Sequence, residues 1–129
     1  MNKDSEIIEE EIDPPVVNRM AVAVKVKQPY IDWANGLPDN SGMIVTADKI
    51  NEKPTTFLMP NYETESSIEK FLQKAKPRIF AQQLNAWCTD PDWWPEDLSA
   101  REFNKWFDLE VSEMIFDLVE NESLDHVEY

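Results

Sequence analysis

The stretch SAREFNKWFDLEVSEMIFDLVEN, residues 99–121, decides the predicted fold. It opens with a capping box, in which the Ser99 hydroxyl accepts a hydrogen bond from the Glu102 amide while the Glu102 carboxylate reaches back to the Ser99 amide. Apolar residues then recur at spacings of three and four, which places them on one face of a helix; they are Phe103, Phe107, Val111, Met114 and Leu118. The pattern predicts one uninterrupted helix from Ser99 to Asn121.

Two other sets of side chains would lie outside that apolar stripe. Acidic residues would form a neighbouring strip of the helix; they are Glu102, Glu110, Glu113, Asp117 and Glu120. Leu109 and Phe116, seven residues apart, would form a second apolar stripe. A helix with three such stripes predicts more than one contact. We therefore expect Leu109, Glu113, Phe116 and Asp117 to contact a partner.

The rest of the chain predicts a small sheet with helical cover. Residues 19–27, RMAVAVKVK, alternate as a half-buried strand does, and residues 55–59, TTFLM, form a second strand. Residues 43–45 form either a third strand or a loop anchor. Short helical segments begin at Pro29, which suits a first turn, and after Thr46, which can cap one.

A second long helix is predicted for residues 66–88, after a capping box made by Ser66 and Glu69. Pro77 lacks an amide donor and crowds the preceding turn, so a kink or a break is expected at about residue 76. The fold class is therefore α+β, with a two- or three-stranded sheet covered by helices 66–88 and 99–121. Residues 1–18 are predicted to be a mobile acidic leader, 19–121 a single domain, and 122–129 a frayed acidic tail.

The net charge of −14 is distributed unevenly along the chain. Residues 1–13 carry six acids and one base, residues 14–88 seven acids and nine bases, and residues 89–129 thirteen acids and two bases. An acidic field of this kind repels nucleic acid and anionic lipid, so neither is expected as a direct partner. The basic residues of helix 66–88 are expected to face the acids of helix 99–121; they are Lys70, Lys74, Lys76 and Arg78.

Few residues in this chain suit catalysis or metal binding. It has one cysteine, Cys88, one histidine, His126, and two glycines, which disfavours a catalytic triad and excludes a multi-thiol metal site and a glycine-rich phosphate loop. No catalytic residue, metal ligand or cofactor is predicted. No apolar run approaches the roughly 20 residues of a membrane span, and the N-terminus lacks the apolar region of a secretory signal. We expect a cytoplasmic protein.

Tryptophans are concentrated around the segment WWP, residues 93–95. Trp93 and Trp94 are predicted to meet Trp87, Trp106 and Phe103 at the corner between the two long helices. One interpretation is that these rings are core and stabilise an open corner. The other is that they form a recognition surface, because tryptophan is enriched in interface hot spots.

Four segments together resemble a family of small uncharacterised bacterial proteins. They are MAVAVKVKQPYIDWAN, TTFLMP, W-x-x-D-x-x-W-W-P and F-x-x-W-F-D-x-E, and the most specific part is WWPEDLSAREFNKWFDLEV. The resemblance covers about residues 18–120. It implies a bacterial cytoplasmic origin and a fold complete in this length, and it implies no activity.

Three functions remain open on these observations. The first is a non-enzymatic protein-interaction module that uses Leu109, Phe116, the acidic strip and the tryptophan corner, with another protein or a second copy as partner. The second is a small-molecule-binding protein or an enzyme with a carboxylate and aromatic site. The third is an acidic mimic of nucleic acid that occupies a basic groove of another protein. The first is the prediction taken forward.

Overall fold

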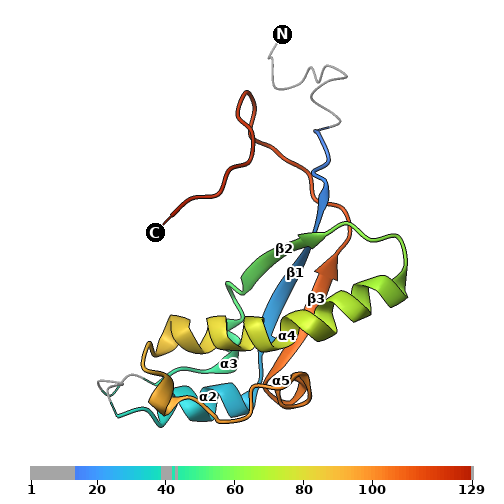
Figure 1. Cartoon of the computed structure of the whole chain (residues 1–129). Coiled ribbons are helices and arrows are strands. Elements are labelled where there is room, and N and C mark those ends of the chain that lie inside the picture. The colour runs from blue at the N-terminus through green and yellow to red at the C-terminus, as the bar shows by residue number, and fades with distance from the viewer. Residues whose placement is uncertain (1–13, 39–41, 43, 129) are drawn as a thin grey trace.

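The computed structural model describes residues 14–38, 42 and 44–128 of the chain (Figure 1). Its elements follow in the order β1 (Arg19–Val26), α2 (Gln28–Asn35), α3 (Ala47–Ile50), β2 (Thr55–Pro60), α4 (Glu65–Trp87), a 3₁₀ turn (Pro91–Trp93), α5 (Ala100–Trp106) and β3 (Phe107–Ser112). The predicted α+β class is confirmed. Most of the acidic leader predicted for residues 1–18 lies outside the described residues.

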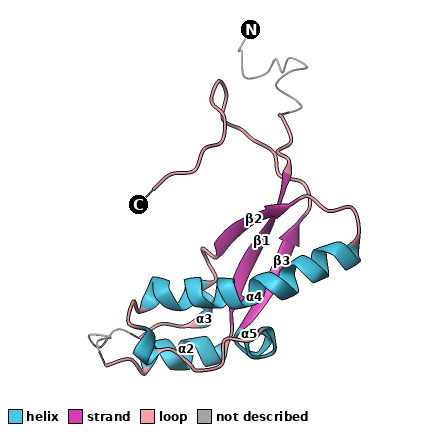
Figure 2. Cartoon of the chain, in the orientation of Figure 1, coloured by secondary structure: helices cyan, strands magenta, loops and turns pink. Residues whose placement is uncertain are grey.

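The strands form one three-stranded sheet in the order β2-β1-β3, and both pairs are antiparallel (Figure 2). β1 is the central strand, and its alternation directs Met20, Val22, Val24 and Val26 to the face that α4 crosses. The third strand is β3. Of the residues 43–45 for which a strand was considered, Ile44 and Val45 have no regular structure and Met43 lies outside the described part.

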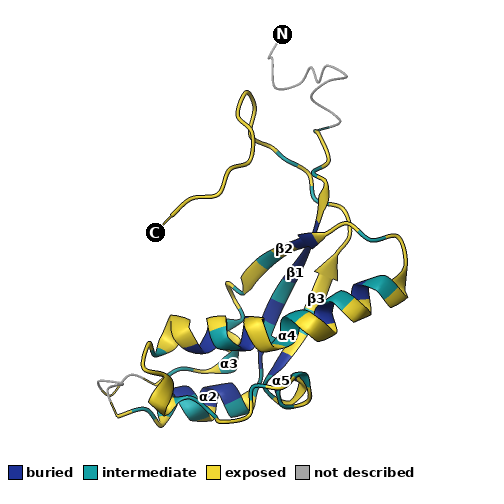
Figure 3. Ribbon diagram, viewed as in Figure 1, coloured by how far each residue is buried: buried dark blue, intermediate teal, exposed yellow. Residues whose placement is uncertain are grey.

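Two apolar clusters between the sheet and α4 make up the core. The larger joins the Val24–Val26 end of β1 to the second half of α4 and to Phe103 and Phe107. The smaller joins Met20 and Val22 to Met59 and the first half of α4. Figure 3 shows the consequence for α4, whose sheet side is buried and whose outer side is exposed.

The long helix predicted for residues 99–121 is wrong beyond Trp106. α5 ends there, and β3 begins at the next residue and pairs with β1 from Val26↔Phe107 to Ala21↔Ser112. Phe107, Leu109 and Val111 alternate with acids at a period of two, which is also the pattern of a half-buried strand. Pairing with β1 favours the strand over the helix. A helix at residues 107–112 would leave this side of β1 without backbone hydrogen-bond partners.

Of the predicted helical stripe, only Phe103 lies on a helix; Phe107 is buried as expected but belongs to β3, and the last two members are exposed. Phe103 and Phe107 are 0% and 2% exposed, whereas Met114 and Leu118 are 62% and 82% exposed. The capping box is half formed: the Ser99 hydroxyl accepts from the Glu102 amide at 3.2 Å, but the Ser99 amide donates to Asp97 at 2.9 Å. Hydrogen bonds from the Ser99 side chain and amide hold the pKa of Asp97 below its usual value.

The other long helix, α4, runs through Pro77 without interruption. The break allowed by that proline does not occur, and a bend there stays a prediction. α4 begins at Glu65, earlier than predicted, because Thr64 is the cap and accepts a hydrogen bond from the Ser67 amide at 3.2 Å.

Tyr30, on α2, places a phenol inside the core. Its ring is 4% exposed, and its hydroxyl donates to the carbonyl oxygen of Gln83 on α4 at 2.8 Å. Burial disfavours the phenolate and raises the pKa of Tyr30 from 10.0 to about 12. The bond ties α2 to α4 across the lower end of the sheet.

Matched leucine substitutions test the corrected fold. Leu84 is 0% exposed on α4, so Leu84→Ala is expected to lower the free energy of unfolding by about 2–5 kcal/mol. Leu118 is 82% exposed, so Leu118→Ala should change it by less than about 0.5 kcal/mol. Urea denaturation measures both. Equal losses would contradict β3 and favour the long helix, which would bury Leu118.

Tyr30→Phe tests the buried phenol. The raised pKa means that the folded state binds more protons than the unfolded state between about pH 10 and about pH 12. The stability that this phenol contributes is complete below pH 10 and is lost as the pH rises through that window. The cost of Tyr30→Phe, about 1 kcal/mol at neutral pH, should therefore shrink at high pH. Denaturation of both proteins between pH 8 and about pH 11.5 measures the difference, in which lysine titration cancels; a constant difference would contradict the assignment.

Candidate functional site

The seven residues predicted to contact a partner lie in three separate places. Trp93, Trp94 and Trp106 belong to an aromatic corner near α2 and α5. Leu109 is on β3. The other three, Glu113, Phe116 and Asp117, follow β3. Leu109 and Phe116 do not form the predicted second apolar stripe, because the helix that would carry both is absent.

At the aromatic corner, some tryptophan rings are packed and another is exposed. Trp106 is half-buried and packs against Tyr30, Trp33 and Phe80, with ring centroids 6.4, 6.3 and 5.3 Å away. The Trp94 indole N–H donates to the carbonyl oxygen of Cys88 at 2.8 Å. Trp93 contributes its carbonyl oxygen, which accepts from the Trp33 indole at 2.8 Å, while its ring stays 52% exposed. Trp106 and Trp94 therefore support the corner, and the Trp93 ring is free for contact.

Beyond β3, the chain continues as a narrow two-stranded ribbon with residues 15–17. The Val17 amide donates to the Ile115 carbonyl and the Asp117 amide to the Pro15 carbonyl, both at 2.8 Å. Phe116 lies opposite Val16 in this ribbon and is 44% exposed. The Asp117 carboxylate accepts from the Val119 amide at 2.8 Å, and Glu113 is exposed. Glu113 and Asp117 were predicted to share one face of a helix, and this prediction is wrong.

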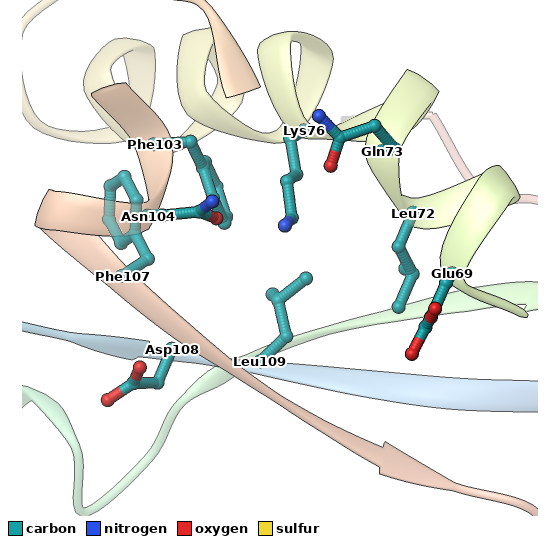
Figure 4. Close-up of a pocket in the computed structure, with 9 residues that line it drawn as sticks. All are labelled: Glu69, Leu72, Gln73, Lys76, Phe103, Asn104, Phe107, Asp108 and Leu109. Carbon is teal, nitrogen blue, oxygen red and sulfur yellow. The ribbon is translucent and has the colours of Figure 1, made fainter. Parts of the chain in front are cut away.

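A hollow of about 460 Å³ lies between α4, α5 and β3 (Figure 4). Leu72 and Leu109 line its apolar part, and the Lys76 amine enters it 6.0 Å from the centroid of the Phe103 ring. Glu69 and Asp108 add carboxylates, and Asp108 pairs with Lys27 at 3.3 Å. The hollow mixes one amine with two carboxylates, so its charge favours no single class of ligand.

The free edge of β2 is the more distinctive surface. β2 and β3 are the edge strands of the sheet, and β3 carries Asp108 and Glu110 on its edge. β2 has the sequence TTFLMP, without a charged residue, and its Leu58 is 55% exposed. Natural proteins usually protect edge strands with charges, bulges or cover, because unpaired backbone groups accept further strands. β2 carries no charged side chain that could protect it in this way.

The hydrogen-bonding direction of each β2 residue follows from that of β1. The Asn51 side chain bonds both backbone groups of Val26 on the β2 side of β1, at 2.8 and 3.1 Å. Backbone groups alternate sides along a strand, so Val24 and Val22 also face β2, and their partners Thr55 and Phe57 face back. The intervening residues, Thr56 and Leu58, therefore direct their N–H and C=O groups outward. Pro60 also faces outward, but it has no N–H group to donate.

A hollow of about 300 Å³ lies beside this edge, between β2 and α4. Phe57 and Met59 line it from the sheet, and Phe71, Ala75 and Arg78 line it from the helix. Phe71 packs against Tyr62 with ring centroids 5.9 Å apart, which makes the Met59 end aromatic. The site therefore combines outward backbone groups with an apolar recess.

A basic row on α4 reaches the recess at Arg78, the one cation of the row that lines it. Lys70, Lys74 and Arg78 are exposed and spaced by four, so they share one side of the helix. Within the described part of the chain, none of them forms an ion pair; the pairs found are Lys27–Asp108, Lys49–Glu52 and Lys105–Glu102. The prediction that this row faces acids of helix 99–121 is wrong, because β3 takes the place of that helix. Lys76 alone approaches that region, over Phe103.

Other kinds of site find no support in the described residues. In residues 14–38, 42 and 44–128, no group of three or more histidine, cysteine or acidic side chains is placed to hold a metal ion. None of the described helices is long and apolar enough to cross a membrane. Comparisons with protein-family models, curated proteins and solved structures found no match.

Amide hydrogen exchange tests the free edge. Because they face away from β1, the Thr56 and Leu58 amides should exchange quickly, while those of Thr55, Phe57 and Met59 should be protected. NMR exchange on dilute protein measures each amide, and the amides of β1, which lie between two strands, serve as the protected reference. Protection of all five β2 amides would show that the edge is already covered.

Proposed function

We propose that this chain is a small, non-enzymatic, cytoplasmic protein-interaction module that binds its partner by strand addition at β2. The observation that supports the proposal is the uncharged edge of β2, with the outward backbone groups of Thr56 and Leu58 and an apolar recess beside them.

The physical reason is that each outward N–H and C=O group is a strong hydrogen-bonding group, and none of them has a backbone partner among the described residues. An extended segment placed alongside β2 would satisfy these groups, and its alternate side chains would enter the recess against α4. In strand addition, the main-chain bonds supply affinity and the side-chain recesses supply specificity. The two properties needed are found together at this edge.

Other surfaces support additional contacts. The exposed rings of Trp93 and Phe116 stay within the proposed partner surface, as do Glu113 and Asp117 at the acidic end of the chain. A second copy of the chain is the competing partner, since two β2 edges can pair about a twofold axis. Light scattering separates the two cases, because only self-association raises the mass of the pure protein.

Photo-crosslinking in cells tests the proposal. A benzophenone amino acid at position 58 should form an adduct of defined mass with the partner. The same group at position 110 should not, although Glu110 lies on the same open face of the sheet at the opposite edge. Adducts of equal yield at both positions, or at position 110 alone, would contradict strand addition at β2.

Proline variants supply the matched control for that experiment. Thr56→Pro removes an outward amide that bonds no strand, so the fold should survive while the adduct from position 58 is lost. Val111→Pro makes the equivalent change on the outward side of β3 and should leave the adduct intact. Circular dichroism of both variants confirms folding; an adduct that survives Thr56→Pro would show that the contact does not need the outward Thr56 amide and would contradict strand addition there.

A further inference from the structure

We propose that the segment bound at β2 is acidic, with one apolar side chain opposite Met59 followed by carboxylates opposite Phe57 and Thr55. This inference rests on the proposed function and names the chemistry of its partner. It is argued from the recess, the basic row and the charge of the two sheet edges.

The position of an added strand is set by the sheet itself. It would lie about 4.8 Å from β2 and bond the outward groups of Thr56 and Leu58. Its side chains opposite Thr55, Phe57 and Met59 would then point to the α4 side, because opposite residues of neighbouring strands share a face. Three alternate positions of the partner therefore meet α4.

The first of these positions is apolar. Met59 packs in the cluster that contains Ile68 and Leu72, with Phe71 and Tyr62 against it. A side chain placed opposite Met59 would meet the half-buried ring of Phe71 in the recess. A branched aliphatic side chain such as valine fits this apolar surface and favours the extended backbone.

The next two positions meet positive charge. α4 runs on from Phe71 past Ala75, whose small side chain leaves room, to Arg78 at the border of the recess. Lys74 and Arg78 are one helical turn apart, about 6 Å along the axis, and alternate strand residues are about 6.8 Å apart. One carboxylate would meet Arg78 in the recess, and the other would pair with Lys74 through the long side chain of that residue, one turn earlier on α4.

The distribution of charge between the edges favours an acidic partner here. The described acids of the sheet, Asp108 and Glu110, are both on β3, whereas β2 has none. Lys74 and Arg78 have no carboxylate partner among the described residues. In a chain of net charge −14, this flank is locally positive, and a matching acidic segment would complete its ion pairs.

Labelled heptapeptides and the full-length protein test the inference. TVTETET presents valine and two glutamates on one face in the order expected for antiparallel addition, and TETETVT presents them for parallel addition. TVTQTQT and TQTQTVT are the neutral counterparts. In fluorescence anisotropy, one acidic peptide should bind about fivefold more tightly than its glutamine counterpart at low salt, and added salt should reduce this ratio.

Two double variants with the same charge change identify the cations. Lys74→Gln/Arg78→Gln should abolish the preference for glutamate over glutamine. Arg101→Gln/Lys105→Gln changes an equally spaced basic pair on α5, away from β2, and should leave the preference unchanged. In the same samples, the bound peptide should slow exchange of the Thr56 and Leu58 amides.

The outcomes separate failure of this inference from failure of the proposed function. Equal binding of acidic and neutral peptides with protection of Thr56 and Leu58 would overturn the inference and keep strand addition. Binding without that protection would overturn the inference, because the peptide would then lie elsewhere. If no peptide binds and position 58 forms no adduct, both proposals fail. A dimer with protected β2 amides would identify a second copy as the occupant and overturn the acidic partner.

Discussion

Hydrogen bonding of β1 to both of its neighbours is the constraint on which the rest of the structure depends. β1 bonds β2 on one side and β3 on the other, and its valines face α4. The core then has one buried face, the helix lies on that face, and both neighbours of β1 become edges. A chain with only two strands would have left β1 itself as an edge, and two-stranded sheets are marginal in water. Pairing of residues 107–112 with β1 is therefore what makes the small sheet stable.

The same arrangement makes the two edges chemically different. β3 carries Asp108 and Glu110, and charged side chains protect an edge strand from further pairing. β2 is left uncharged, beside an α4 whose exposed lysines and arginine have no acidic helix opposite them. The described acids of the two edge strands therefore lie on β3, whereas outward backbone groups and positive charge lie together at β2. This juxtaposition is the physical basis of the proposed partner.

The aromatic residues serve mainly to join elements rather than to form a flat surface. Phe80 of α4 contacts Phe103, Trp106 and Phe107, with ring centroids 5.3 to 5.9 Å away, so the helix, α5 and the start of β3 are joined at one point. Tyr30 adds a buried hydrogen bond from α2 to the same helix. The loop of tryptophans after α4 is held by indole donors to backbone carbonyls, which leaves Trp93 as the exposed ring. Most of these aromatic rings therefore pack between elements and are not exposed for recognition.

The sequence by itself determined the local elements: the alternation of β1 and TTFLM, the helix start at Ser99, the short helices after Lys27 and Thr46, and the α+β class. It determined these because capping, proline placement and strand alternation act within a few residues. Only the tertiary structure decided that residues 107–112 form a strand, since their apolar spacing satisfies both periods and the deciding hydrogen bonds come from β1, more than eighty residues earlier. It alone also decided the candidate site. Which strand is an edge, and which backbone groups of β2 face outward, depends on pairing between distant segments, and no local pattern in TTFLMP encodes that choice.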